Sequence, residues 1–157
     1  MTEKILNMTD PAARTRSGND RCFMVPFAAS QVMTRRGGKA VDLHHQYQAA
    51  TANSSNLAGW LEQDAIGISG GHPETVATGD RLPVNFGVDK SAVMPTTGRA
   101  ATEADVGKSF DISVVSNRQF VNMSASTKGV IKVESIIDES GAWVGASIPL
   151  DKRYGNL

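Results

Sequence analysis

The sequence predicts an all-β fold, a small β-barrel or β-sandwich with an extended N-terminal arm. Apolar and polar residues alternate in many short segments, which is the period of a half-buried strand. Turn-forming residues separate these segments at intervals of about 8–12 residues, and no segment has the apolar spacing of an amphipathic helix of three turns. We expect roughly six to eight short strands in the 157 residues, which is close to the size of one domain.

Residues 1–21 are expected to form the arm, because turn-forming residues and solvated arginines dominate this segment. Within it, Pro11 to Arg14 predict a single helical turn with Asp10 as its cap. Residues 22–157 are then expected to form one β-domain.

The first half of that domain gives weaker strand patterns. A strand is expected at 22–27, where Pro26 restricts it to a sheet edge or a bulge. Small and polar residues dominate 40–58, so we expect an irregular connection there with one short strand or none. Further strands are expected at 65–68 and at 82–88, where alternate apolar residues share one face.

The pattern is clearest after residue 90. Thr102 to Asp105 have the spacing of a capping box and predict one helical turn, which Gly107 ends. A short apolar pair precedes a turn expected at 95–98. The remaining strands are expected at 110–114, at 120–123, and in a hairpin of 130–137 and 142–150 around the loop 138–141.

No motif for a nucleotide or another cofactor is found, and we expect none to be bound. Gly107-Lys108-Ser109 repeats the end of a phosphate-binding loop, but Thr102 stands where that motif needs an earlier glycine. The residues after Ser109 predict a strand, whereas a phosphate-binding loop leads into a helix. Gly107 is therefore expected to serve a turn.

The histidines do not predict a metal site. His44 and His45 are adjacent, so on a strand they point to opposite faces and cannot share an ion. His72 lies in a glycine-rich loop and is the remaining histidine, and the single cysteine adds neither a zinc ligand set nor an intramolecular disulfide.

The carboxylates likewise do not predict catalysis. Glu62 and Asp64 flank a strand start, and the pair 138–139 lies in an expected hairpin loop, where acids are solvated. An enzyme would most plausibly be a hydrolase that uses His72 with Asp64 or Asp80, and we rank this interpretation last. The protein is expected not to be an enzyme.

Three large or reactive side chains have two interpretations each. Cys22, next to Phe23 and Met24, is expected to be a buried small apolar residue, and the alternative is a nucleophile. Trp60 and Trp143 are expected in the core or at subunit contacts, and the alternative is a platform on which sugars stack.

Composition limits the partners. Lys plus Arg and Asp plus Glu are both 16, and this balance argues against direct nucleic-acid binding through a basic surface. No apolar run approaches the roughly 20 residues that cross a bilayer, and the N-terminus lacks the apolar stretch of a signal peptide. We expect a protein made in the cytoplasm of its host, with no membrane partner. Because aromatic residues make up only 6%, the core is thin, which favours association with further copies.

Four segments of the chain form a recognisable pattern: Gly59-Trp-Leu-Glu62, Val76–Leu82, Ala104-Asp-Val-Gly-Lys-Ser-Phe-Asp111, and the hairpin 130–150 that runs into Lys152-Arg-Tyr-Gly155. By this pattern, residues 57–155 resemble the small head-decoration (cement) proteins of tailed bacteriophages. In that family an Ala-x-Val-Gly-Lys-like turn leads into a strand, and the last hairpin ends in a basic and aromatic tail.

The resemblance implies a virion structural protein on the outer surface of an icosahedral head. It would bind the major capsid protein as a homotrimer or homodimer and hold neighbouring capsid subunits together. Two physical arguments are consistent with this implied function. Many copies that bind a lattice gain avidity, and an arm that orders on binding adds contact area. The arm residues expected to contact the capsid are Ile5, Leu6, Met8, Arg14, Arg16 and Arg21, and the aromatic residues expected in the core or at subunit contacts are Trp60, Trp143 and Tyr154.

Two alternatives remain. Within phage biology, the chain would be a tail or head–tail connector subunit, which forms rings. From another class, it would be a carbohydrate-binding β-domain that uses Trp60 or Trp143.

Overall fold

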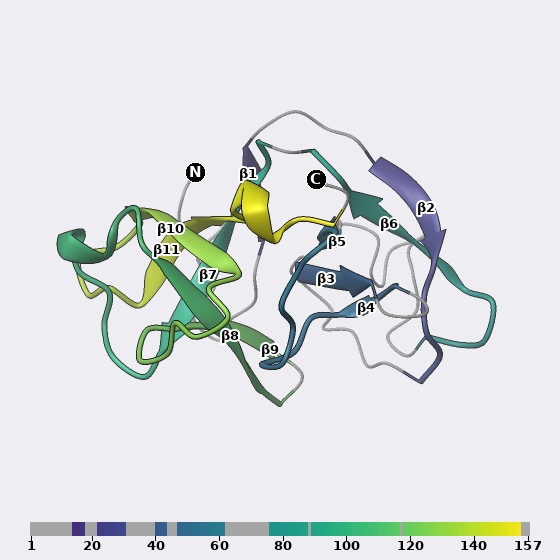
Figure 1. The fold of residues 1–157 in the computed structure, drawn as a ribbon, viewed down its shortest axis with the longest axis horizontal. Coiled ribbons are helices and arrows are strands. Elements are labelled where there is room, and N and C mark those ends of the chain that lie inside the picture. Colours follow the sequence, from purple (N-terminus) through teal and green to yellow (C-terminus); the bar gives the residue numbers. More distant parts are fainter. Residues whose placement is uncertain are drawn as a thin grey trace.

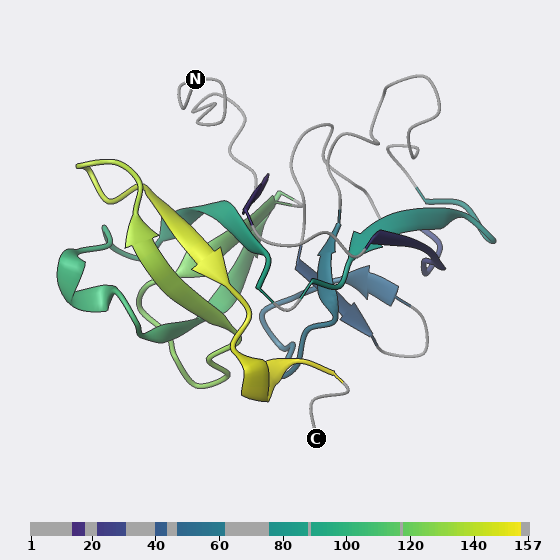
Figure 2. The same cartoon turned by 90° about the horizontal axis from the view of Figure 1, so that it is seen from above.

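The all-β prediction is confirmed by the structure, a computed structural model in which a closed five-stranded barrel lies beside a second sheet (Figure 1). Figure 2 shows the same two halves from above, with the C-terminal segment running from the barrel to the second sheet. The structure describes residues 14–17, 22–30, 40–43, 47–61, 76–87, 89–116 and 118–154.

The barrel is built from the second half of the chain. Its strands are β7 (Ser91–Thr97), β8 (Ser109–Val115), β9 (Arg118–Asn122), β10 (Ile131–Ile136) and β11 (Trp143–Ser147). They follow the order β7-β11-β10-β8-β9, and a parallel pairing of β9 with β7 closes the barrel. One further strand, β1 (Arg14–Ser17), pairs antiparallel with the first residues of β7. The β1 and β9 strands therefore occupy successive parts of one edge of β7.

The second sheet comes from the first half of the chain. Its strands are β2 (Cys22–Pro26), β3 (Ala40–Leu43), β4 (Tyr47–Ala49), β5 (Gly59–Leu61) and β6 (Arg81–Asn85). Their order is β2-β6-β5-β3-β4, and every pairing is antiparallel. A single parallel bridge between Phe27 and Tyr47 connects the two ends of the sheet.

The middle strands of the second sheet are buried on both faces. Successive residues of a strand point to opposite faces, and here each face meets a different core. Ala40 and Trp60 pack in the larger cluster, which also contains the barrel interior. Their neighbours Val41 and Leu61 pack in a second cluster beneath β2 and β6. The two halves of the molecule thus share one apolar layer.

A buried glutamine joins the two halves by hydrogen bonds. Gln119, on β9, is 2% exposed. Its side-chain oxygen accepts from the amide of Ala40 at 2.8 Å, and its nitrogen donates to the carbonyls of Ala40 and Ala50 at 3.0 and 2.9 Å. The Ala40 carbonyl also accepts from the Ala50 amide at 2.8 Å, and Gln119 supplies the partners of the Ala40 amide and the Ala50 carbonyl in this dry interior.

The capping box is confirmed. A one-turn 3₁₀ helix, η3 (Glu103–Asp105), begins after Thr102, and the Asp105 carboxylate accepts from the Thr102 amide at 2.8 Å. Asp105 also forms two hydrogen bonds with Arg99, and these lower the pKa of Asp105 well below its ordinary value. Gly107 follows with φ of +89°, which confirms the turn expected there.

Several sequence predictions are wrong in detail. The described residues contain eleven strands rather than six to eight. Residues 40–58 contain β3 and β4 as a hairpin, and not one strand at most, because these short strands are built from residues buried or half-buried on both faces. Pro95 lies within β7, where it pairs opposite Trp143, rather than in a turn. Arg14 belongs to a strand instead of a helical turn, since β7 offers it an edge. Residues 65–68 lie outside the described residues, and one domain over 22–157 stays a prediction.

Gln119→Leu should destabilise the protein, because it removes the side-chain partners of the buried Ala40 amide and Ala50 carbonyl. At roughly 1–3 kcal/mol for each unsatisfied group, we expect a loss of several kcal/mol in the free energy of unfolding. Gln48→Leu, on half-buried β4, is the matched control and should change it by about 0.5 kcal/mol or less. Denaturant titration measures both, and equal effects would contradict the role of Gln119.

Candidate interaction surface

The exposed part of the second sheet is its edge strand β2. Val25 and Phe27 point into the second core and are 8% and 1% exposed. Phe23 and Met24 are 63% and 54% exposed, although both are large and apolar. Phe23 shares the inward side with Val25 by the two-residue period and pairs opposite Val84, but its ring is left largely uncovered on this edge strand. An exposed phenylalanine beside an exposed methionine makes this edge a candidate contact surface.

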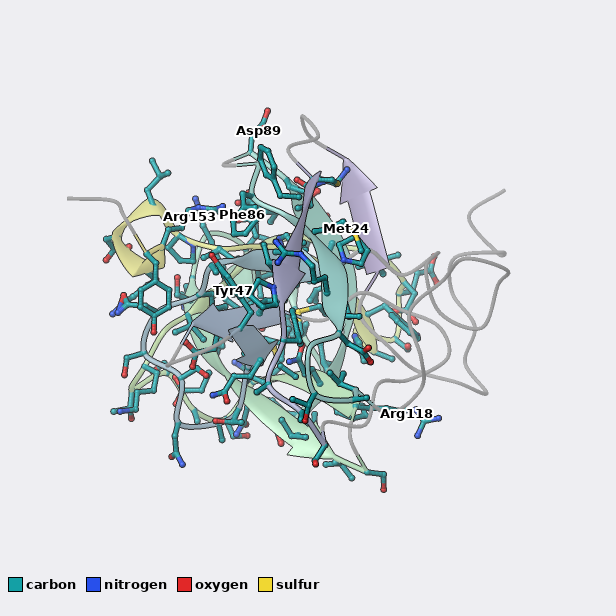
Figure 3. The ribbon with its side chains drawn as sticks, turned by 90° about the vertical axis from the view of Figure 1, so that its right-hand side faces the viewer. Met24, Tyr47, Phe86, Asp89, Arg118 and Arg153 are labelled. Carbon is teal, nitrogen blue, oxygen red and sulfur yellow. The ribbon has the colours of Figure 1, made fainter. Side chains whose placement is uncertain are left out.

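An aromatic row connects this edge to the opposite end of the sheet. The ring of Phe23 lies 6.1 Å from that of Phe86, and the ring of Tyr47 lies 5.9 Å from Phe86 in an edge-to-face arrangement. Phe86 and Tyr47 are half-buried and pack on the second core. Figure 3 shows Met24, Tyr47 and Phe86 on the same side of the molecule. The exposed ring of Phe23 is therefore supported by Phe86, which itself packs on the second core. We call Phe23, Met24 and Phe86 the β2 patch.

The backbone edge of β2 is poorly suited to add another strand. Pro26 has no amide hydrogen to donate. Arg81, opposite Pro26 on β6, donates from its guanidinium to the carbonyl of Met24 at 3.0 Å. Natural edge strands use prolines and charged side chains in this way to prevent unlimited sheet extension. Contacts at the β2 patch are consequently made by side chains.

A second apolar patch lies on the barrel, at the end of β8. Val114 and Val115 are 42% and 53% exposed. The strand β10 pairs with β8 only at Ser109 and Phe110, so the far end of β8 has β9 as its neighbour and projects from the barrel. Ser116 turns the chain there with φ of +51°. We call Val114 and Val115 the hairpin patch.

The C-terminal segment connects the barrel to the second sheet. After β11, the 3₁₀ helix η4 (Leu150–Lys152) leads to Arg153 and Tyr154. The Leu57 amide donates to the carbonyl of Lys152, and the Tyr154 amide donates to the carbonyl of Leu57. The phenol of Tyr154 donates to Asp42 at 2.8 Å, and Asp42 also accepts from Ser54. The C-terminal segment thereby joins β3, and the residues that lead into β5, to the end of β11.

Arg153 is buried without a carboxylate among the described residues. Its Nη2 donates to the carbonyls of Phe86 and Ala58 at 2.9 and 3.4 Å, and its Nη1 has no partner there. Burial lowers the pKa of Arg153, but an arginine stays charged at any ordinary pH. Figure 3 shows Arg153 beside Phe86. The charge is therefore held by carbonyl oxygens at the base of the β2 patch.

The structure separates the aromatic residues named from the sequence. Trp60 and Trp143 are 0% and 1% exposed, and both belong to the interior, so neither ring offers a face to a sugar. The Trp60 indole nitrogen has no partner in the described part of the chain. Tyr154 is 43% exposed, while its hydroxyl is held by Asp42.

The arm residues are only partly described. Arg14 and Arg16 lie in β1, beside β7. The other predicted capsid contacts lie outside the described residues, namely Ile5, Leu6, Met8 and Arg21.

Cys22 is exposed at the start of β2, so the prediction that it is buried is wrong. Its strand lies at the sheet edge, where alternate residues face outward. Asp80 and Asp138 hold turns, because their carboxylates accept from the amides of Ala77 and Ala142. The remaining candidates lie outside the described residues: His44, His45, Glu62, Asp64 and His72.

Sequence reasoning missed both patches. In the expected strand 110–114, alternation sets Val114 on one face with Phe110 and Ile112, yet Val114 is 42% exposed whereas the other two are buried. Sequence reasoning treated Phe23 and Met24 only as neighbours of Cys22. The useful signal was the edge character imposed by Pro26, together with a complete lack of charge from residue 22 to residue 30.

Comparisons with known proteins add no relative. No family, curated protein or solved structure matches this chain. Among the described residues, no three His, Cys, Asp or Glu side chains are grouped to hold a metal ion. The helices in the described ranges are all too short or too polar to span a membrane.

The Tyr154–Asp42 contact should make stability depend on pH above 10. Burial, and after it the hydrogen bond to Asp42, raise the pKa of Tyr154 from 10.0 to about 12. The folded chain therefore holds this proton more tightly than the unfolded chain. Its stabilising contribution is complete below pH 10 and is lost as the pH rises from 10 to about 12.

Tyr154→Phe is the matched variant. Unfolding free energies measured between pH 9 and 12 should fall more steeply for the wild type than for the variant. The variant should also be less stable at pH 8, because Asp42 loses a donor. Parallel pH profiles would contradict the assignment.

Proposed function

We propose that this chain is a virion structural protein, a capsid decoration protein that binds the outside of an icosahedral phage head. It contacts major capsid subunits and strengthens the joints between them. The resemblance of residues 57–155 to head-decoration proteins suggests this function. The all-β fold and the positions of its apolar patches support it.

The observation that carries the proposal is the presence of two apolar patches on two different sheets. The β2 patch lies on the second sheet and the hairpin patch on the barrel, well apart from it (Figure 1). Gln119 and the C-terminal segment connect the sheets through buried hydrogen bonds. A molecule that joins neighbours needs two contact surfaces at a fixed separation, and this chain provides them.

Weak contacts are sufficient for such a protein. Each patch is small, and so a single contact would give modest affinity. On a lattice, however, each further contact of a bound oligomer forms at a high effective concentration, which multiplies the affinity. We assign the hairpin patch and the arm to the capsid.

Purified protein should co-sediment with empty heads of the phage whose genome encodes this chain, at a fixed number of copies per capsid subunit. Val114→Ser with Val115→Ser should weaken this binding at least about tenfold, because polar hydroxyls replace the apolar contact. Val106→Ser is the control, since Val106 is also an exposed valine, on the loop after η3. Failure of the wild type to pellet with heads would overturn the proposed function.

Removal of residues 1–13 tests the arm separately. This truncation removes Ile5, Leu6 and Met8 and keeps β1, so the β7 edge stays paired. We expect saturable binding with a clearly larger dissociation constant. Unchanged binding would show that the arm does not contact the capsid.

A further inference from the structure

We infer that the outer face of the barrel at β7 and β11, centred on Trp143, is the docking surface of residues 1–13 of the same chain, the N-terminal segment. This docking goes beyond the proposed function, because it concerns the free protein and needs no head. Three observations carry it: an outward-facing tryptophan is buried, the register of β1 brings the N-terminal segment to it, and that segment contains apolar side chains that can cover it.

Trp143 lies on the outer side of the barrel wall. Its neighbour Val144 packs in the larger cluster, inside the barrel, so the two-residue period of β11 turns Trp143 outward. Pro95 pairs opposite Trp143 and shares its face. Val93 pairs opposite Gly145, two residues from Trp143, and lies on this face too. We call Trp143, Pro95, Val93 and Gly145 the Trp143 strip.

The Trp143 strip is covered, although it lies outside the barrel. Trp143 and Val93 are 1% and 2% exposed, and neither apolar cluster of the described residues contains them. On the next strand, β10, the outer face is uncovered, because Glu134, which accepts from Ser147 on that face, is exposed. A side chain on a single wall keeps its outer side accessible unless a further element packs over it. A segment of the chain therefore covers the strip.

The register of β1 brings the N-terminal segment to the strip. Arg14 pairs opposite Val93, and β1 runs antiparallel to β7, so the residues before Arg14 head toward Pro95. There β9 takes over the edge of β7, at Thr96, and closes it to further pairing. The larger cluster fills the barrel interior. The outer face, with Pro95 and Trp143, is what remains for the chain.

The other segments outside the described ranges are attached elsewhere. Those that begin and end at the second sheet are 31–39, 44–46 and 62–75. Residues 155–157 follow the C-terminal segment, which is bound at Leu57. Residues 18–21 leave β1 after Ser17, which pairs opposite Ser91 at the end of β7 away from the strip. The N-terminal segment is the one whose attachment point adjoins the strip.

The length and composition of the N-terminal segment fit this surface. Trp143 lies two strands across and two residues along from Arg14, a distance of about 12 Å. The six residues from Arg14 back to Met8 span up to about 20 Å, so the segment reaches across the strip. Its large apolar residues Ile5, Leu6 and Met8 lose contact with water when they pack on Trp143, which favours docking.

These three apolar residues are also arm residues expected to contact the capsid. In the free protein, docking on the Trp143 strip keeps them out of water and prevents them from joining other copies through exposed apolar surface. Their binding to a capsid then exchanges one apolar contact for another, which leaves a smaller net gain in affinity.

The test follows the two indole N–H signals of the full-length chain, labelled with ¹⁵N, while a soluble paramagnetic chelate is added. Trp143→Phe assigns the two signals. In the wild type we expect both signals to resist the chelate. With Ile5→Ser, Leu6→Ser and Met8→Ser combined, the Trp143 signal should be lost, whereas the signal of Trp60, which is 0% exposed, should stay.

The matched control changes three polar residues of the same segment. Glu3→Ser, Lys4→Ser and Asn7→Ser combined should leave the Trp143 signal resistant. An accessible Trp143 in the wild type, or a resistant one in the folded apolar triple variant, would overturn the inference. The Trp60 signal reports whether each variant is folded.

A second measurement keeps all three apolar residues in place. A nitroxide is attached at Thr9→Cys in a chain that also carries Cys22→Ser. It should broaden the Trp143 signal more strongly than a nitroxide at Thr78→Cys, in the exposed turn before β6, which lies on the side of the second sheet away from the barrel (Figure 1). Equal broadening from the two positions would contradict the docking.

These results separate the inference from the proposed function. A chain with a protected Trp143 that does not pellet with heads keeps the inference and overturns decoration. A chain that pellets with heads while its Trp143 is accessible keeps decoration and overturns the inference.

Discussion

The structure depends on how the polar backbone of β3 and β5 is satisfied between two apolar layers. Both strands are buried on both faces, so water cannot supply hydrogen bonds to backbone groups that neighbouring strands leave free. Side chains from distant segments do so instead. Gln119 serves Ala40 and Ala50, and Arg153 serves Ala58 and Phe86. The two sheets are thereby joined by specific hydrogen bonds as well as by apolar packing.

Burial of Arg153 costs free energy but holds two backbone carbonyls in fixed positions. Burying a guanidinium without a carboxylate is unfavourable, since neutral carbonyls return only part of the hydration that is lost. The same guanidinium holds the carbonyl of Phe86, whose ring supports Phe23. The guanidinium of Arg153 thus fixes the backbone of Phe86, and the Phe86 ring supports that of Phe23. A flexible base would require the patch to be ordered at each contact, which would weaken binding.

The parts of the fold that could be predicted are those where one local rule determines the structure. The hairpin of β10 and β11 follows from two apolar segments around a loop in which Asp138 accepts from the Ala142 and Trp143 amides. The capping box at Thr102 is equally local. In contrast, β3 and β5 have no polar face, so no alternation marks them. Their existence depends on partners 60 or more residues away, such as Gln119, which a local pattern does not contain.

The contact surfaces were hidden from the sequence for a related reason. Val114 lies beyond the residues at which β10 pairs with β8, and that register is not contained in the local pattern. Phe23 is exposed although it pairs opposite Val84 on β6, because β2 is the edge strand of the second sheet. A residue that continues the inward alternation becomes a surface residue as soon as its strand passes the end of its neighbour.

Strand ends and sheet edges therefore leave parts of an ordinary apolar pattern exposed. The hairpin patch continues the apolar pattern of β8 beyond the residues that pair with β10, and the β2 patch lies on the edge strand of the second sheet. Such a surface is held rigidly because its side chains are continuous with the packed core, and for the same reason it is apolar. At the β2 edge, Pro26 and Arg81 limit backbone pairing, so that association through the patch does not become sheet growth. A protein meant to join others in a fixed number needs this combination of an exposed apolar face and a blocked backbone edge.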